Sequence, residues 1–333
     1  MIRLLSKLVV LVVVAAIALG GGLYYLVSQP RVMPGETEQV VIAQGSGVKS
    51  VAQVLAKAQV VENPHVFVWW VRLTGNSGKI KAGNYVFNGN LSMRDVLRLL
   101  VEGDVTQSSL RFTEGWNLRQ VREALAENDA LTHDTSSMTP EQLAASLGID
   151  KATPEGWLFP DTYHFSSGLS ELQILRRAHQ QMQTVLERAW AERAPGLPFA
   201  TPYEALIMAS IVEKETGLAS ERPMIAGVFI NRLRIGMRLQ TDPTVIYGLG
   251  EQYNGNLTRV HLQTDTPYNT YTRAGLPPTP IAMPGSDSIH AVLHPADTKA
   301  LYFVATGDGG HVFSTNLAAH NAAVWRYQIK RKH

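Results

Sequence analysis

Two glutamates stand at the end of a largely apolar segment, in the sequence Val212-Glu213-Lys214-Glu215-Thr216. The segment 203–216 is expected to form a helix that is apolar on all sides and therefore buried. A carboxyl group in apolar surroundings has a raised pKa and can act as a general acid near neutral pH. The alternative is a helix that simply emerges into solvent, with Gly217 just beyond its end.

The two glutamates are two positions apart, which is about 200° around a helix at roughly 100° per residue. Glu213 and Glu215 are therefore expected to point to nearly opposite sides, so that at most one of them faces a given cleft. The spacing does not say which.

Other segments combine aromatic side chains with polar ones. The segment 155–163 contains three aromatic residues, a proline and the carboxylates Glu155 and Asp161. Aromatic faces beside carboxylates suit sugar rings, although an ordinary aromatic turn in the core would look the same. The segments 238–244, 268–271 and 275–280 resemble the wall of a binding groove, with a proline-stiffened surface loop as the alternative.

The composition excludes several other chemistries. The chain of 333 residues contains no cysteine, which rules out disulfides, thiolate metal sites and cysteine nucleophiles. His290 and His294 have the spacing of metal ligands on a helix, but Pro295 interrupts the helix there. A net charge of +2 without a stripe of clustered lysine and arginine gives no case for nucleic acid.

The pattern along the chain is α+β, without a regular alternation of strand and helix. Helices are expected from Ser50, from Ser92 to Leu100, over 117–127 and from Ser170 to Ala194, with the three serines as N-caps. Further helices are expected over 203–216, 225–234 and 316–329, and strands over 39–42, 85–87, 110–112 and 301–305. The apolar segment 67–73 is either a helix or a strand, and 88–90 is a turn.

The N-terminus predicts a membrane anchor. Leu8 to Val27 is a run of twenty uncharged residues, which as a helix can cross the hydrocarbon core of roughly 30 Å. Arg3 and Lys7 precede it, so the N-terminus is expected in the cytoplasm and the rest of the chain outside. A cleaved signal peptide is the alternative.

Several motifs together resemble the endolytic murein transglycosylase family, also called YceG-like. They include residues 155–163, 209–216, 229–233, 239–248, 268–271, 275–278, 294–296 and 301–304. The resemblance spans the chain and is most specific over 150–320. One departure is Met283, where a small polar residue is expected, and it puts a groove contact there in doubt.

The resemblance implies three parts: a cytoplasmic tip and transmembrane anchor over 1–30, a small LysM-like α/β subdomain over 31–107, and a larger α+β catalytic domain with a binding groove over 108–333. It implies location in the bacterial inner membrane, with the catalytic domain outside the cytoplasm. The implied partners are peptidoglycan strands and the membrane, with peptidoglycan synthases as a further hypothesis. No cofactor, metal or nucleic acid is implied.

The resemblance also implies that one glutamate cleaves the β-1,4 bond between N-acetylmuramic acid and N-acetylglucosamine, acting first as acid and then as base. We assign this role to Glu215, with Glu213 in reserve. The other candidate site residues support the site or bind sugar, and they are Gln240, Asp242, Asn269, Tyr271, Glu155 and Asp161.

Two other functions stay open. The chain could be a membrane-anchored peptidoglycan-binding protein without catalysis. It could also be a hydrolase in which Asp161 or Asp242 is the second carboxylate, which requires the two carboxyl groups to lie within about 5–10 Å.

Overall fold

The computed structural model describes residues 14, 18, 20–30, 37–88, 90–103, 107–166 and 168–330. Its internal contacts divide the chain into two compact units. Unit 1 comprises residues 1–109, 130–132 and 164–169, and unit 2 comprises 110–129, 133–163 and 170–333. The functional boundaries expected after residues 30 and 107 remain predictions.

Unit 1 contains a two-stranded antiparallel sheet in which Val40 lies opposite Tyr85. The strands and helices between residues 37 and 103 are β1 (Thr37–Ile42), α2 (Val48–Lys57), α3 (Pro64–Leu73), β2 (Gly83–Asn88) and α4 (Met93–Glu102). Apolar side chains from all five elements form one core, because each helix turns an apolar face toward the sheet. The expected strands at 39–42 and 85–87 are confirmed, and the expected turn at 88–90 includes residue 89, which lies outside the described residues.

The N-termini of the helices in unit 1 show which of the predicted N-cap residues are correct. Ser92 is confirmed as the N-cap of α4, in a reciprocal capping box with Asp95. The prediction for Ser50 is wrong, because α2 begins at Val48 with Gly47 as its N-cap. The ambiguous segment 67–73 belongs to a helix, which begins after Asn63 because this side chain accepts hydrogen bonds from the first free backbone N–H groups.

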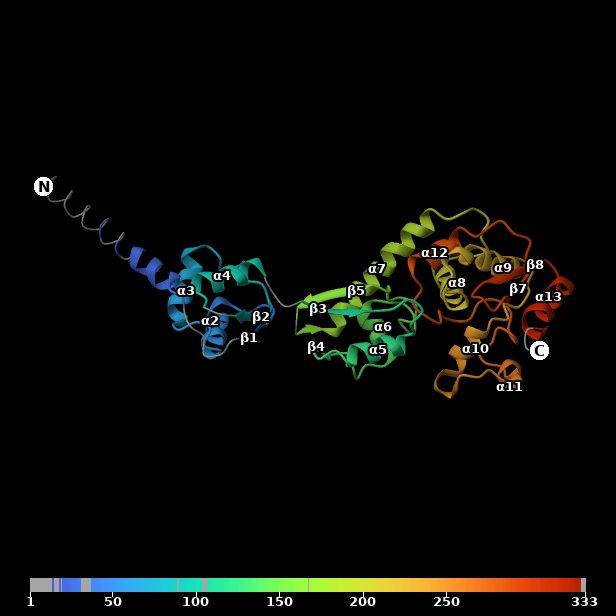
Figure 1. Ribbon diagram of the computed structural model, residues 1–333, viewed down its shortest axis with the longest axis horizontal. Helices are drawn as coiled ribbons and strands as arrows, with labels where there is room; N and C mark the ends of the chain where they lie inside the picture. Colours follow the sequence, from blue (N-terminus) through green and yellow to red (C-terminus); the bar gives the residue numbers. More distant parts are fainter. Residues whose placement is uncertain are drawn as a thin grey trace. The chain divides into compact units, whose positions relative to one another are not determined.

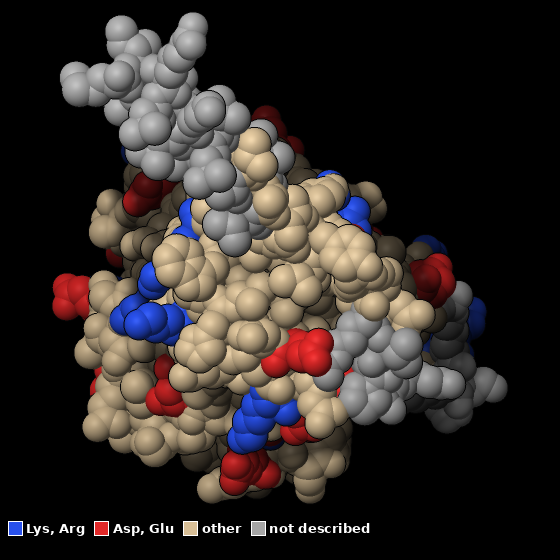
Figure 2. Space-filling view, turned by 90° about the vertical axis from the view of Figure 1, so that its left-hand side faces the viewer, with Lys and Arg blue, Asp and Glu red and all other residues tan. Residues whose placement is uncertain are grey.

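The surface of unit 1 exposes large apolar side chains on α3. Trp69 and Leu73 are 66% and 69% exposed. Figure 2 shows a face of the molecule that is largely uncharged, with scattered lysine, arginine and acidic side chains.

Part of the expected membrane anchor lies outside the described residues, namely 8–13, 15–17 and 19. Among the residues that the structure describes, no helix is long and apolar enough to cross a membrane. The anchor therefore remains a prediction.

The rest of the chain mixes helices with short strands, so the α+β class is confirmed (Figure 1). Strands β3 (Gln107–Arg111) and β5 (Thr162–Ser166) pair, as do β4 (Leu131–Thr132) with β6 (Leu169–Ser170) and β7 (Tyr302–Ala305) with β8 (His311–Ser314). The helices are α5 (Leu118–Ala126), α6 (Pro140–Leu147), α7 (Glu171–Ala191), α8 (Pro202–Glu215), α9 (Arg222–Arg234), α10 (Asp242–Leu249), α11 (Arg259–Gln263), α12 (Ser286–Leu293) and α13 (Leu317–Val324). A π-helical turn, Trp325–Ile329, follows α13.

Helix α8 is the centre of unit 2. Residues 205–212 are all buried, as the apolar sequence predicts, and α7, α9 and α12 pack around them (Figure 1). Ser210 is the polar exception, and its hydroxyl group accepts a hydrogen bond from the backbone N–H of Ile281 at 3.0 Å. This contact fixes the loop before α12 against the helix that ends at Glu215.

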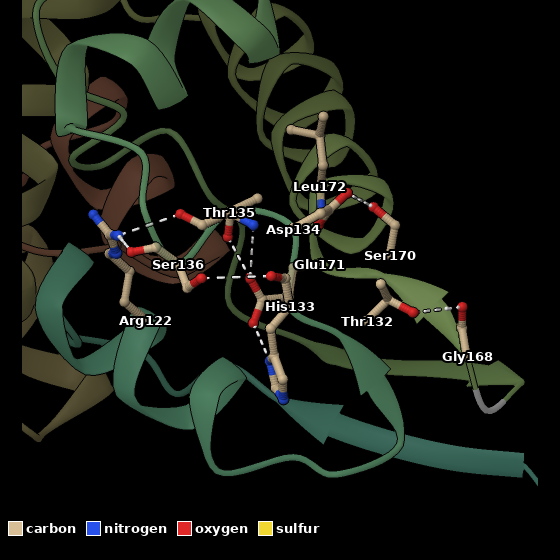
Figure 3. A network of polar contacts seen from close by, with 10 residues as sticks. All are labelled: Arg122, Thr132, His133, Asp134, Thr135, Ser136, Gly168, Ser170, Glu171 and Leu172. Carbon is tan, nitrogen blue, oxygen red and sulfur yellow. Dashed lines mark hydrogen bonds and ion pairs between the residues drawn. The ribbon is translucent and has the colours of Figure 1, made fainter.

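The start of α7 is held by a network of buried polar groups (Figure 3). Glu171 is 2% exposed, and its carboxylate accepts hydrogen bonds from the hydroxyl and backbone N–H of Thr135 and lies 2.6 Å from Nδ1 of His133. Ser170 is the N-cap residue as expected, and its hydroxyl donates to Asp134. These bonds compensate the cost of burying a carboxylate, and they fix loop 133–136.

Gly156 follows Glu155 directly and has a left-handed backbone with φ of +78°. A methyl group there would overlap the ring of Pro280. We expect Gly156→Ala to lower the free energy of unfolding by about 3 kcal/mol or more, through backbone strain and overlap. Gly148→Ala is the matched control, because Gly148 has φ of +76° with open space around it; it should lose only about 1–2 kcal/mol. Equal losses in urea denaturation would contradict the overlap.

Candidate active site

Glu213 and Glu215 turn to different sides of the end of α8, as the helical spacing predicts. Glu213 lies 3.1 Å from the guanidinium group of Arg222, and its other oxygen accepts the backbone N–H of Gly285 at 2.9 Å. Glu215 instead accepts a hydrogen bond from the hydroxyl group of Thr241. The two carboxylates therefore have separate surroundings.

The surroundings of Glu213 are those of a structural ion pair. The side chains of Glu213 and Arg222 are 5% and 8% exposed, and Arg222 also contacts Asp287 at 3.2 Å. Both carboxylate oxygens of Glu213 have partners within the protein. Glu213 therefore joins α8 to α9 and to the start of α12.

Glu215 has the electrostatics of a general acid. The pKa of its carboxyl group is raised to about 7, mainly by burial and in smaller part by the negative charge of Asp242. The Thr241 hydroxyl bond, His311 and Arg232 act in the opposite direction, because each stabilises the ionised form. A carboxyl group with this pKa is substantially protonated near neutral pH, as an acid catalyst requires.

Thr241 is held in place by two other buried threonines. Its backbone N–H donates to the hydroxyl group of Thr270 at 3.0 Å, and its carbonyl oxygen accepts from the Thr244 hydroxyl at 2.8 Å. The residue before it, Gln240, has φ of +50°, a conformation that L residues rarely adopt. The bonds around Thr241 therefore hold a strained turn against Glu215, and such strain is typical of functional sites.

Glu215 lies in a cavity of about 470 Å³ within unit 2, which we name the Glu215 cavity. Of the predicted candidates, Gln240, Asp242 and Tyr271 line it together with Glu215. The Tyr271 hydroxyl group donates a hydrogen bond of 2.6 Å to Asp242, so each of these two side chains orients the other. The cavity is also lined by polar and aromatic residues that the sequence does not predict as site residues, namely Arg232, Tyr302, His311 and His320.

His311 is the most firmly oriented of these additional residues. Its backbone N–H and its ring Nδ1 lie 2.8 and 2.7 Å from the two oxygens of Glu221. With Nδ1 engaged by a carboxylate, Nε2 is the ring nitrogen left for the cavity. In sequence His311 is an isolated histidine after two glycines, and nothing in that pattern distinguishes it from a surface residue.

The remaining candidates lie elsewhere. Asn269 is fully buried, and its amide group donates to three backbone carbonyls and accepts the N–H of Tyr271, so it holds the loop and does not line the cavity. Asp161 is exposed and outside the cavity lining, and Glu155 lines a different cavity. Met283 is buried, with its backbone paired to residues 115 and 116, so it offers no groove contact.

Unit 2 therefore combines a mixed α and β fold with a buried carboxylic acid of raised pKa in a cavity with polar and aromatic lining. The model of the YceG-like family matches residues 40–326. The chain belongs to the YceG-like family.

Relatives of known name support the assignment. The endolytic murein transglycosylase of Bacillus subtilis is 33% identical over 87% of this chain and 85% of its own length. That of Streptococcus pneumoniae is 26% identical over 92% of this chain, which spans only 62% of that longer protein. A crystal structure of a protein described as YceG-like, from Listeria monocytogenes, has a TM-score of 0.56 at 30% identity and covers 86% of this chain and 98% of its own.

Proposed function

We propose that this chain is an endolytic lytic transglycosylase that cleaves the β-1,4 bond between N-acetylmuramic acid and N-acetylglucosamine. The observation that carries the proposal is the buried carboxyl group of Glu215, which has a pKa of about 7 and lies in a cavity with polar and aromatic lining. The named relatives support the same class of enzyme and the same polymer as substrate.

The mechanism needs only one carboxyl group. Protonated Glu215 donates its proton to the glycosidic oxygen, and the bond from that oxygen to C1 of muramic acid breaks. The 2-acetamido group stabilises the cation that develops at C1. Ionised Glu215 then takes the proton of the muramic C6 hydroxyl, whose oxygen attacks C1. The product is a 1,6-anhydro ring, no water is consumed, and Glu215 ends protonated as it began.

Thr241 has a defined part in this cycle. Its hydroxyl group donates a hydrogen bond to Oε1 of Glu215. The other carboxyl oxygen, Oε2, is therefore the one left for proton transfer to the substrate. The bond also stabilises the carboxylate in the interval between the two proton transfers, since a hydrogen bond to the charged form favours that form.

The pH dependence of kcat/KM should follow from the ionisation of Glu215. Activity requires the protonated acid, so we expect kcat/KM to fall about tenfold per pH unit above a pKa of about 7. Thr241→Val removes a bond that lowers this pKa, so the falling limb should move to higher pH. The control is Thr272→Val, at a partly exposed threonine whose hydroxyl group donates to Asp265. An unmoved limb in Thr241→Val would contradict the assignment.

The length of glycan strands after incubation with the protein distinguishes an enzyme that cleaves them from a protein that only binds them. Incubation with purified glycan strands should shorten them progressively from internal positions, as chromatography of strand lengths would show. Strands that bind the protein and keep their length would instead indicate a peptidoglycan-binding protein without catalysis.

For the N-terminal part we propose a LysM-like lobe that holds peptidoglycan, preceded by an inner-membrane anchor with the catalytic domain outside the cytoplasm. The exposed Trp69 supports the lobe, because sugar rings pack on aromatic faces. The uncharged run from Leu8 to Val27 supports the anchor. Peptidoglycan synthases are the proposed neighbours, and a crosslinking search that recovers none would contradict this.

A further inference from the structure

Unit 2 contains a second and larger cavity, of about 820 Å³, which we name the Tyr247 cavity. It adjoins the Glu215 cavity at two points of the chain. Lys214 lines the Tyr247 cavity, and the next residue, Glu215, lines the Glu215 cavity. Likewise, Asp242 lines the Glu215 cavity and the next residue, Pro243, lines the Tyr247 cavity. Because consecutive Cα atoms are only about 3.8 Å apart, the two cavities lie close together at the C-terminal end of α8 and the N-terminal end of α10.

The lining of the Tyr247 cavity is that of a built site. One face of α10 turns toward it, since Pro243, Ile246, Tyr247 and Gly250 recur at helical spacing. Two more tyrosines, Tyr253 and Tyr268, also line it. The rings of Tyr247 and Tyr268 pack edge to face, with their centroids 4.8 Å apart.

Glu155 fixes this wall. It is 2% exposed and accepts hydrogen bonds from the Tyr247 hydroxyl at 3.0 Å and from the backbone N–H of Leu118 at 3.1 Å. The charged side chains in the lining are of both signs: Lys214, which donates to the Gly115 carbonyl, Arg119, which pairs with Glu123, and Glu251. The cavity thus offers tyrosine rings among polar groups of both signs, which suits a saccharide because sugar hydroxyl groups both donate and accept hydrogen bonds.

We propose that the Tyr247 cavity binds the saccharide units of the same glycan strand that lie beyond the cleaved bond. This rests on the proposed function, since an enzyme that cuts within a strand must accommodate chain on both sides of Glu215. The cavity is nearly twice as large as the Glu215 cavity, and its volume is within the range of about 300–1,000 Å³ that is typical of specific ligand sites.

Tyr253 provides the test, because it is partly exposed and its hydroxyl group takes part in no hydrogen bond that holds the described fold together. Binding is measured by calorimetry in a Glu215→Gln background, so that nothing is cleaved. The probes are a disaccharide and longer β-1,4-linked N-acetylglucosamine oligomers. Tyr253→Ala should weaken binding of the long oligomers about tenfold and leave the disaccharide unchanged, whereas Tyr253→Phe, which keeps the ring, should bind both as the parent does.

Two outcomes would overturn the proposal. Long oligomers that bind Tyr253→Ala unchanged would show that the cavity takes no sugar. A loss seen only with glycan strands that carry stem peptides, and absent with strands stripped of them, would assign the cavity to the peptide. Failure of the parent to bind any saccharide would instead contradict the proposed function itself, so the two failures are distinguishable.

Discussion

Glu215→Gln is expected to fold normally and to lose cleavage of glycan strands by about 10²–10⁴-fold, the usual contribution of a general acid. The amide has nearly the shape of the carboxyl group and can still accept the Thr241 hydroxyl bond, but it has no proton to give at neutral pH. The rate of product formation from purified strands measures the loss.

The stability of this variant should also change in a predictable direction. The folded-state pKa of Glu215 is raised from 4.5 to about 7, so between these values folding takes up a proton. Stability therefore falls as pH rises through this window, by roughly 3 kcal/mol if the shift is fully realised. Glu215→Gln removes this loss and should be at least as stable as the parent at pH 8. The control is Glu187→Gln, an exposed position on α7 that should change neither quantity.

Glu213→Gln is expected to show the reverse pattern, with lost stability and retained catalysis. It removes one charge of a buried pair, and the carboxylates that remain near Arg222 are those of Asp287 and Glu114, whose side chains are 70% and 50% exposed. The free energy of unfolding should fall by about 3 kcal/mol, near the lower end of the cost of breaking such a pair. Urea denaturation measures the fall, and activity is compared at a temperature where both proteins are folded.

Asp287→Asn is the matched control for the ion pair. Asp287 contacts the same guanidinium group, but its side chain is 70% exposed, so the loss should be within about 1 kcal/mol. A Glu213→Gln protein that keeps full stability and loses catalysis would reverse the assignment of the two glutamates.

The sequence predicts the regular elements well, because local periodicity and capping specify them. The apolar segment 203–212 becomes a buried helix, and Ser92 starts α4 as its capping box indicates. Ser50 fails as a cap because a serine before an apolar stretch does not exclude an earlier start, and the N-cap of α2 is Gly47, about one turn earlier.

The site is predicted less completely, because it is assembled from segments far apart in the chain. The spacing of the two glutamates on one helix correctly predicts that Glu213 and Glu215 point to different sides. The Thr241 bond and the Glu221–His311 pair depend on tertiary approach over 26 and 90 positions, which no local pattern encodes. Asn269 shows a second limit, since the sequence does not distinguish a polar residue that contacts a ligand from one that, as here, satisfies buried carbonyls.

The central claim is that Glu215 works without water and without a second carboxylate, although Asp242 lines the same cavity and could serve a hydrolase. Mass spectrometry of the products formed in ¹⁸O-labelled water decides this most directly. We predict new ends that carry no label and are one water lighter than hydrolysis products. New reducing ends that carry one ¹⁸O atom would contradict the account and assign a hydrolytic reaction.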